Sequence, residues 1–187
     1  TWHYPGAWRL LGLLFIPMPV IGIVLSIVAP ELLRKRLNAK EQESEQKQVI
    51  VLSALIFIVG FVLAGLDFRF GWTQLPLAVV IAGMMLFLLA YGLYIEVMRE
   101  NAYLSRTVEI QEGQKVIDTG LYGIVRHPMY MAVTILFLSM PLVLGSAIAI
   151  VPFLGVPAVM VKRIRNEEEV LVKGLPGYEA YQKKVTY

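Results

Sequence analysis

The chain has 187 residues, of which 57% are hydrophobic and 17% are charged, and its mean hydropathy is +0.65. Charged residues make up about a quarter of an ordinary soluble domain, so this composition excludes a soluble globule. The absence of cysteine excludes thiolate metal sites and disulfides, and two histidines argue against a histidine-rich metal site. The composition therefore predicts an integral membrane protein without a metal or a nucleic-acid partner, whose chemistry is built from helix ends and short loops.

Five apolar stretches follow one another along the chain, at 10–29, 49–66, 75–97, 129–144 and 146–161. Each approaches the roughly 20 residues that a helix needs to cross a bilayer. The first and the last contain two prolines each, which predict kinks. Only the junction between Gly145 and Ser146 separates the last two stretches, so they should form a tight helical hairpin. The sequence thus predicts an all-α membrane protein with about five transmembrane helices.

The distribution of lysine and arginine predicts the orientation of the chain. The segments 1–9 and 67–74 hold one such residue each, whereas 30–48, 98–128 and 162–187 hold the other fifteen of the 17. Five spans place those three segments on one side of the membrane, and basic loops favour the cytoplasmic side. We therefore expect an external N-terminus and a cytoplasmic C-terminus, which in a bacterium means the inner membrane.

The chain divides near residue 97 into two parts. Residues 1–97 hold the first three predicted helices and the loop 30–48, whose polar stretch 41–47 predicts a solvated turn or short helix. Residues 98–187 hold a loop, the last two helices and the C-terminal tail. Within 106–118, apolar and polar residues alternate on both sides of a Glu-Gly pair, which is a weak hairpin signal.

An unusual segment, GLYGIVRHPMY at 120–130, leads into the fourth predicted helix. Pro128 disfavours helical geometry at His127 and suits the first turn of the helix. The helix then begins with unpaired backbone N–H groups beside Arg126, which together suit a carboxylate or a phosphate. A lipid phosphate on Arg126 and a simple helix cap from His127 would account for the same residues.

A second polar cluster, KRIRNEEEVL at 162–171, follows the fifth predicted helix. If the helix continues, Arg163 and Glu167 share a face, and Glu168 is turned by about 100° from Glu167. Acidic residues at an anionic membrane surface suit a cation or hydroxyl donors better than lipid headgroups. The alternative is a solvated tail helix with internal ion pairs.

The predicted hairpin brings these two clusters side by side. Donors at the start of one helix then face acceptors at the end of the other, and Tyr122 and Tyr130 add aromatic faces that can bind a cation. Such a site suits a small zwitterion that carries a carboxylate, an ammonium group and hydroxyls.

The motif Gly-x-Tyr-x-x-Val-Arg-His-Pro-x-Tyr, followed after two spans by Arg-Ile-x-x-Glu-Glu-x-x-Leu, resembles the isoprenylcysteine carboxyl methyltransferase family. It is also similar to the related phospholipid N-methyltransferases of membranes, and the resemblance covers about residues 101–181. It implies an integral membrane enzyme that uses S-adenosylmethionine. It further implies a cytoplasmic cofactor pocket, formed by the last helical hairpin, the preceding loop and the C-terminal tail, and a lipophilic acceptor that enters from the bilayer.

The resemblance also implies roles for individual residues. We expect Glu168 to hold hydroxyls or the ammonium group of the cofactor, and His127 with the helix start to hold its carboxylate or adenosine. Arg163 or Arg165 should orient an anionic acceptor head. The implied catalytic residues are Arg163 and Glu167. The implied cofactor-binding residues are Gly120, Tyr122, Val125, Arg126, His127, Pro128, Tyr130, Glu167, Glu168, Tyr178 and Tyr181.

Two other readings remain open. Sterol and steroid reductases share a similar Arg-His-Pro segment and acidic tail motif but bind NADPH, although they more often show Asp-Glu followed by Cys where this chain has Glu-Glu. A non-catalytic membrane protein could use both clusters only to anchor helix ends. The sequence does not indicate whether the methyl acceptor is a carboxylate, an amine or a thiol, nor the oligomeric state.

Overall fold

The computed structural model describes residues 3–37, 44–105 and 110–185, and these residues form helices and loops with no strand. The all-α expectation is confirmed for them. The first half contains α1 (Pro5–Phe15), α2 (Pro17–Val28), α3 (Pro30–Leu37), α4 (Ser44–Phe70) and α5 (Leu77–Glu100). The second half contains the 3-10 helix η1 (Gly120–Gly123), α6 (Pro128–Leu144), α7 (Ala147–Phe153), α8 (Val156–Gly174) and α9 (Tyr178–Lys184).

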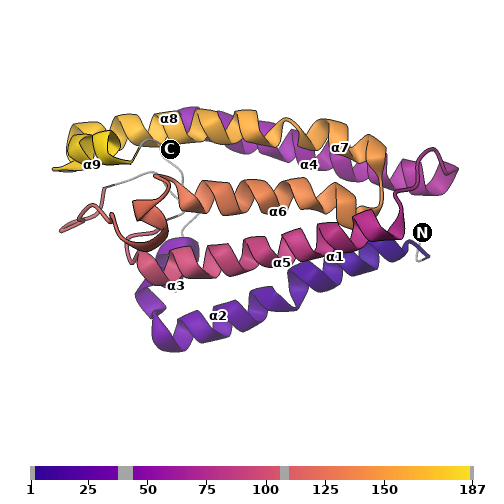
Figure 1. The fold of residues 1–187 in the computed structure, drawn as a ribbon, viewed down its shortest axis with the longest axis horizontal. Helices are drawn as coiled ribbons and strands as arrows, with labels where there is room; N and C mark the ends of the chain where they lie inside the picture. Colours follow the sequence, from indigo (N-terminus) through magenta and orange to yellow (C-terminus); the bar gives the residue numbers. More distant parts are fainter. Residues whose placement is uncertain (1–2, 38–43, 106–109, 186–187) are drawn as a thin grey trace.

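The chain runs along the long axis of the bundle as α1–α2, α4, α5, α6 and α7–α8 (Figure 1). Four of these passes are long and apolar enough to cross a membrane, namely Pro5–Val28, Lys47–Phe70, Leu77–Glu100 and Ala147–Gly174. The remaining pass, α6, is an apolar helix of 17 residues that is buried among the others, so it is shorter than the four candidate spans. The protein is therefore a membrane protein with four clear candidate spans and a shorter central helix.

Prolines interrupt the first and last passes, as the sequence predicted. Pro17 begins α2 directly after the end of α1. Pro157 lies in the first turn of α8, after a break at Leu154 and Gly155 that follows α7. Because proline lacks an N–H and clashes with the preceding turn, each long apolar segment is divided into two helices.

The basic segments of the chain gather at one end of the bundle. Figure 1 shows α3, η1, α9, the end of α5 and the start of α6 together at that end, which we call the site end. Residues 44–47 of the predicted polar loop form the first turn of α4, and 38–43 lie outside the described residues. The N-terminus and the turn between α6 and α7 lie at the opposite end. The side of the membrane that the site end faces remains a prediction.

A tight turn joins α6 to α7, as expected for the helical hairpin. Gly145 has a φ of +79°, and its N–H donates to the carbonyl groups of Pro141 and Leu142 at 3.1 and 3.0 Å. The N–H of Ser146 also donates to Pro141, and the Ser146 hydroxyl caps α7 by accepting from the N–H of Ala149 at 3.2 Å. A positive φ strains any residue with a Cβ, so glycine is suited to this position.

The predicted hairpin at 106–118 does not form in the part that is described. Residues 106–109 lie outside the described residues, and 110–118 contain a turn but no strand. Side chains hold this turn: Tyr103 donates its hydroxyl to the carbonyl of Gly113 at 3.1 Å, and Gln111 donates its amide to the carbonyl of Tyr103 at 2.7 Å. An isolated pair of strands is marginally stable, so these contacts and the neighbouring helices determine the path instead.

Candidate functional site

The start of α6 has the geometry that Pro128 imposes. His127 has φ −127° and ψ 62°, outside the helical region, and Pro128 begins the helix. The His127 side chain makes no capping hydrogen bond to α6. It faces α8 instead, where its Nε2 lies 2.9 Å from Oε1 of Glu168. His127 is therefore held across the hairpin rather than on its own helix.

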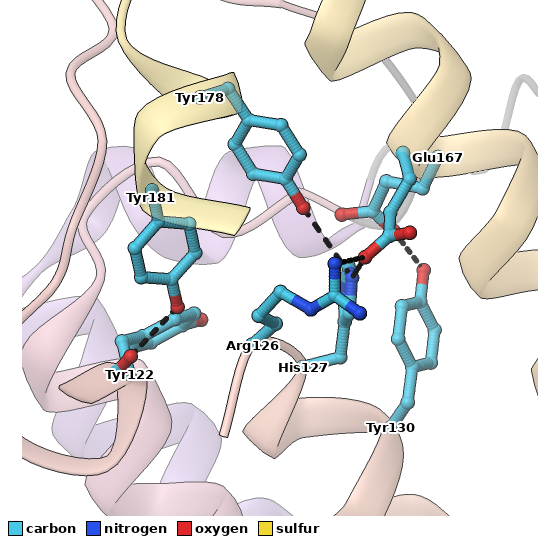
Figure 2. Close-up of polar contacts among 8 residues, drawn as sticks. Tyr122, Arg126, His127, Tyr130, Glu167, Tyr178 and Tyr181 are labelled. Carbon is cyan, nitrogen blue, oxygen red and sulfur yellow. Dashed lines mark hydrogen bonds and ion pairs between the residues drawn. The ribbon is translucent and has the colours of Figure 1, made fainter. Parts of the chain in front are cut away.

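Glu168 is the meeting point of the two motifs. Figure 2 shows that Arg126, His127 and Tyr130 of the first motif lie on the side of the site that Glu167 of the second motif faces. Its Oε1 lies 3.1 Å from Nη1 of Arg126 as well as 2.9 Å from His127, and the Gln182 side chain of α9 also forms a hydrogen bond with it. The carboxylate is thus surrounded by partners from the chain itself. The structure brings the basic and acidic clusters together, as the hairpin predicted.

Glu167 and Arg163 meet at a third residue. The Tyr130 hydroxyl donates to Oε2 of Glu167 and accepts from Nε of Arg163 at 3.0 Å. The guanidinium carbon of Arg163 also lies 5.8 Å from the centroid of the Tyr130 ring, within cation–π range. Arg163 and Glu167, which were expected to share a face of the helix, are therefore connected through the Tyr130 hydroxyl.

A cavity at the site end lies beside these contacts. The loop after α5, η1, α6, α8 and α9 all contribute to its wall. Most of the site residues expected from the sequence line it: Tyr122, Arg126, His127, Tyr130, Arg163, Glu167, Tyr178 and Tyr181.

Four expected residues do not line this cavity, namely Gly120, Val125, Pro128 and Glu168. Pro128 is fully buried at the start of α6. Val125 continues the turn of η1 by donating its N–H to the carbonyl of Leu121 at 3.0 Å. The carboxylate of Glu168 is directed to Arg126 and His127. The geometry therefore favours a positioning role for Glu168 over the direct cofactor contact expected from the sequence.

Gly120 is constrained by Glu100. The carboxylate of Glu100 accepts the N–H of Leu121 through both oxygens, at 3.1 and 2.9 Å, and so fixes the start of η1 at the end of α5. Gly120 has a φ of +53°, and a Cβ built there would lie 1.7 Å from Oε1 of Glu100. Glycine thus suits the backbone conformation of this position, and a Cβ there would also push the Glu100 carboxylate away from Leu121.

We expect Gly120→Ala to lower the melting temperature of the purified protein clearly. The substitution adds about 1–2 kcal/mol of left-handed backbone strain and also displaces Glu100 from η1. Gly113→Ala is a matched control, because Gly113 has a φ of +70° but a Cβ there meets nothing within 4 Å. Equal losses in the two variants would show that the contact with Glu100 contributes nothing.

The helix α9 covers the cavity. The Tyr181 hydroxyl donates to the carbonyl of Tyr122 at 2.7 Å, and the Tyr178 hydroxyl lies 3.5 Å from Nε2 of His127. Lys184 adds an exposed ion pair with Asp118 at 2.7 Å. Burial raises the pKa values of Tyr122 and Tyr181 to about 12, so both hydroxyls stay protonated at neutral pH. The tail therefore closes the site by hydrogen bonds that are available at physiological pH.

The loop after α5 contributes lining residues that the motifs did not indicate. Tyr103, Gln114 and Lys115 line the cavity beside Asn101 and Ser105. Asn101 donates its side-chain amide to the Tyr122 hydroxyl at 2.9 Å. In the sequence, this loop is marked by its place before the first motif and by the weak alternation within 106–118, and neither signal indicates which side chains line a cavity.

Comparison with known proteins identifies a family for the chain. No individual curated protein matches the chain. Residues 78–173 match the isoprenylcysteine carboxyl methyltransferase family, a match that begins in α5, ends in α8 and contains both motifs. Since this match covers more than half of the 187 residues, the chain belongs to the isoprenylcysteine carboxyl methyltransferase family.

Proposed function

We propose that this protein is a membrane methyltransferase that transfers a methyl group from S-adenosylmethionine to a lipophilic acceptor at the site end, on the cytoplasmic side. Membership of a methyltransferase family supports the reaction class. The observation that carries the proposal is the cavity between the two motifs, which is lined by the carboxylate of Glu167, by the cations Arg126 and Arg163, and by aromatic rings of α9.

The chemistry of the lining residues fits this cofactor. S-adenosylmethionine carries two positive groups, one carboxylate, two hydroxyls and an aromatic base. Glu167 supplies an acceptor for a positive group or for hydroxyls, and Arg126 and Lys115 line the same cavity as cations. Tyr178 and Tyr181 offer aromatic surface from α9. When bound, the cofactor supplies an electrophilic methyl group on a positive sulfur, which requires no metal.

The residues of this chain would act mainly by positioning. In-line displacement requires the nucleophile, the methyl carbon and the leaving sulfur to be collinear. Holding the reactants in this geometry lowers the activation barrier by roughly several kcal/mol. Glu168 fixes Arg126 and His127, and the contact of Tyr181 with Tyr122 keeps α9 over the cavity and water out. A carboxylate or thiolate acceptor needs no base, whereas the proton of an amine acceptor could pass to Glu167 or His127.

A second, apolar cavity supports the lipophilic acceptor. It lies between α4, α6 and α8 and shares Ser105, Met129, Tyr130 and Arg163 with the polar cavity. An acceptor whose hydrocarbon part lies in this groove would have its head at Tyr130 and Arg163, beside the cofactor. The competing NADPH reading has no comparable support, because the matched family transfers methyl groups.

The test is cofactor binding to the purified protein in detergent. We expect S-adenosylmethionine, and not NADPH, to raise the melting temperature, because a ligand stabilises the state that binds it. His127→Ala should weaken the binding of S-adenosylmethionine about tenfold to a hundredfold, because a hydrogen bond to a charged group contributes about 1.5–3 kcal/mol. Glu168→Gln should also weaken it, because Arg126 and His127 lose the carboxylate that positions them. Stabilisation by NADPH alone, or unaltered affinity in both variants, would reject this site.

A further inference from the structure

The apolar groove beside the cofactor cavity has a volume of about 390 Å³. Val49 and Ala54 of α4, Val133 of α6 and Met160 of α8 contribute to its walls. Hydrocarbon is therefore the chemical class that this groove can bury, at a gain of about fourfold in affinity for each methylene group removed from water.

Apart from Ser53 of α4, the polar side chains among the described residues that line the groove lie at one end. Arg36 of α3 and Arg163 of α8 line it at the site end, where Tyr130 and Arg163 also line the cofactor cavity. Arg36 is held there by the carbonyl of Ser105, at 3.0 Å, and by the Tyr94 hydroxyl. A molecule that enters with its hydrocarbon part in the groove must therefore place its polar head toward the cofactor.

Aromatic rings lie at the other end of the groove. The rings of Phe57 and Phe137 line it and meet edge to face, with centroids 4.7 Å apart and planes at 88°. Behind them lies Phe153, which is fully buried and whose ring centroid is 5.5 Å from that of Phe57. Phe153 packs directly on the backbone of α4, since a Cβ added to Gly60 would lie 2.4 Å from its ring. The phenyl pair therefore has little room to move deeper.

The depth of the groove follows from the helix that forms one wall. Tyr130 and Phe137 are seven residues apart on α6, which is about 10 Å of helix. A carbon–carbon single bond of about 1.5 Å advances an extended chain by roughly 1.3 Å. About eight carbons therefore fit between the head position and the phenyl pair.

We propose that Phe57 and Phe137 set the longest hydrocarbon chain that the acceptor can bury, at about eight extended carbons. The inference rests on the proposed function only in naming the occupant as the methyl acceptor. Longer chains must bend at the phenyl pair, so their additional carbons gain no further affinity. The two phenylalanines are thus specificity-determining residues.

The experiment uses S-alkyl N-acetylcysteines with straight chains of four to sixteen carbons and the full-length protein in lipid nanodiscs. Protein-free nanodiscs give the free aqueous concentration of each probe, to which the binding constants are referred, and methyl transfer from labelled S-adenosylmethionine is measured in parallel. We expect affinity to rise about fourfold per methylene group and to level off near eight carbons. We call the chain length at which affinity levels off the break.

Two variants should move this break in opposite directions. Phe137→Ala removes the floor and should move the break to chains two or three carbons longer. Val133→Phe places a ring one helical turn nearer the head, about 6 Å, and should move the break about four carbons shorter. Phe61→Ala is the matched control, because Phe61 packs on the same phenyl cluster but does not line the groove, so its break should stay in place.

The outcomes separate this inference from the proposed function. A break that moves with Phe137→Ala and Val133→Phe supports the inference even if no probe is methylated, and that result would count against the proposed reaction. Methylation of every chain length without a break, or no binding that depends on chain length, overturns the inference and leaves the reaction class untouched. If Phe137→Ala fails to fold, Val133→Phe still decides between these results.

Discussion

Glu167→Gln is expected to lower kcat/KM for methyl transfer by about a hundredfold while the protein stays folded. Glu167 is the acid of the second motif that lines the cavity, and it already accepts a hydrogen bond from Tyr130. Glutamine keeps an oxygen for Tyr130 but removes the negative charge. Losing a charged partner in a partly enclosed site costs about 1.5–3 kcal/mol, which corresponds to a factor of ten to a hundred or more.

The partner of Glu167 can be identified from two ligands. S-adenosylmethionine has a positive sulfur, whereas its product S-adenosylhomocysteine has a neutral one and keeps the ammonium group and the hydroxyls. If Glu167 faces the sulfur, Glu167→Gln should weaken the substrate more than the product. If it faces the ammonium group or the hydroxyls, both dissociation constants should rise equally. Isothermal titration in detergent measures both.

The third glutamate of the cluster, Glu169, provides the matched control. Glu169 lies two residues further along α8, is exposed, and does not line the cavity. Glu169→Gln makes the same change in net charge at the same end of the protein, so it should leave both dissociation constants unchanged. Equal losses in the two variants would mean that Glu167 acts only through the overall charge of the site end, and the proposed contact with the cofactor would be wrong.

The sequence was sufficient to predict that the two motifs meet. Apolar stretches of near-span length leave few possible paths, and the short junction at Gly145 and Ser146 forces the start of α6 and the end of α8 together. The non-helical conformation of His127 followed from the local effect of Pro128. These predictions succeeded because each depends on the geometry of adjacent residues or on the bilayer length.

The orientation of individual carboxylates could not be predicted in this way. Glu167 and Glu168 are adjacent, and the helix separates their directions by about 100° without saying which one meets the cavity. The answer depends on α9, where Gln182 helps to hold Glu168 against Arg126 and His127. This answer therefore comes from tertiary packing. The same holds for the path of the loop after α5 and for the contacts that bring Phe57, Phe137 and Phe153 together from α4, α6 and α7.

The second large effect is expected at the opposite end of the bundle, where Asp67 joins three segments. Its side chain is 1% exposed and lies near the end of α4. The carboxylate accepts the N–H and the hydroxyl of Thr73, at 2.6 and 2.5 Å, and also the Ser146 hydroxyl of the turn between α6 and α7. Thr73 in turn accepts the N–H of Ala147 at 3.1 Å.

Asp67→Ala should therefore destabilise the protein by about 3–5 kcal/mol, because it leaves the buried Ser146 hydroxyl and the half-buried donors of Thr73 without their acceptor. At about 2–4 °C for each kcal/mol in a chain of this size, the melting temperature should fall by about 10 °C. Asp118→Ala is a control for the loss of an aspartate, since Asp118 forms an exposed ion pair that contributes little.

The effect of Asp67 on the reaction should be indirect. The Asp67 contacts and the cavity lie at opposite ends of α6, so the molecules of Asp67→Ala that remain folded should bind S-adenosylmethionine as the unchanged protein does. Titration well below the lowered melting temperature measures this. Weaker binding at that temperature, where the variant is still folded, would mean that the turn between α6 and α7 sets the position of His127. The effect would pass along α6, which joins this turn to His127.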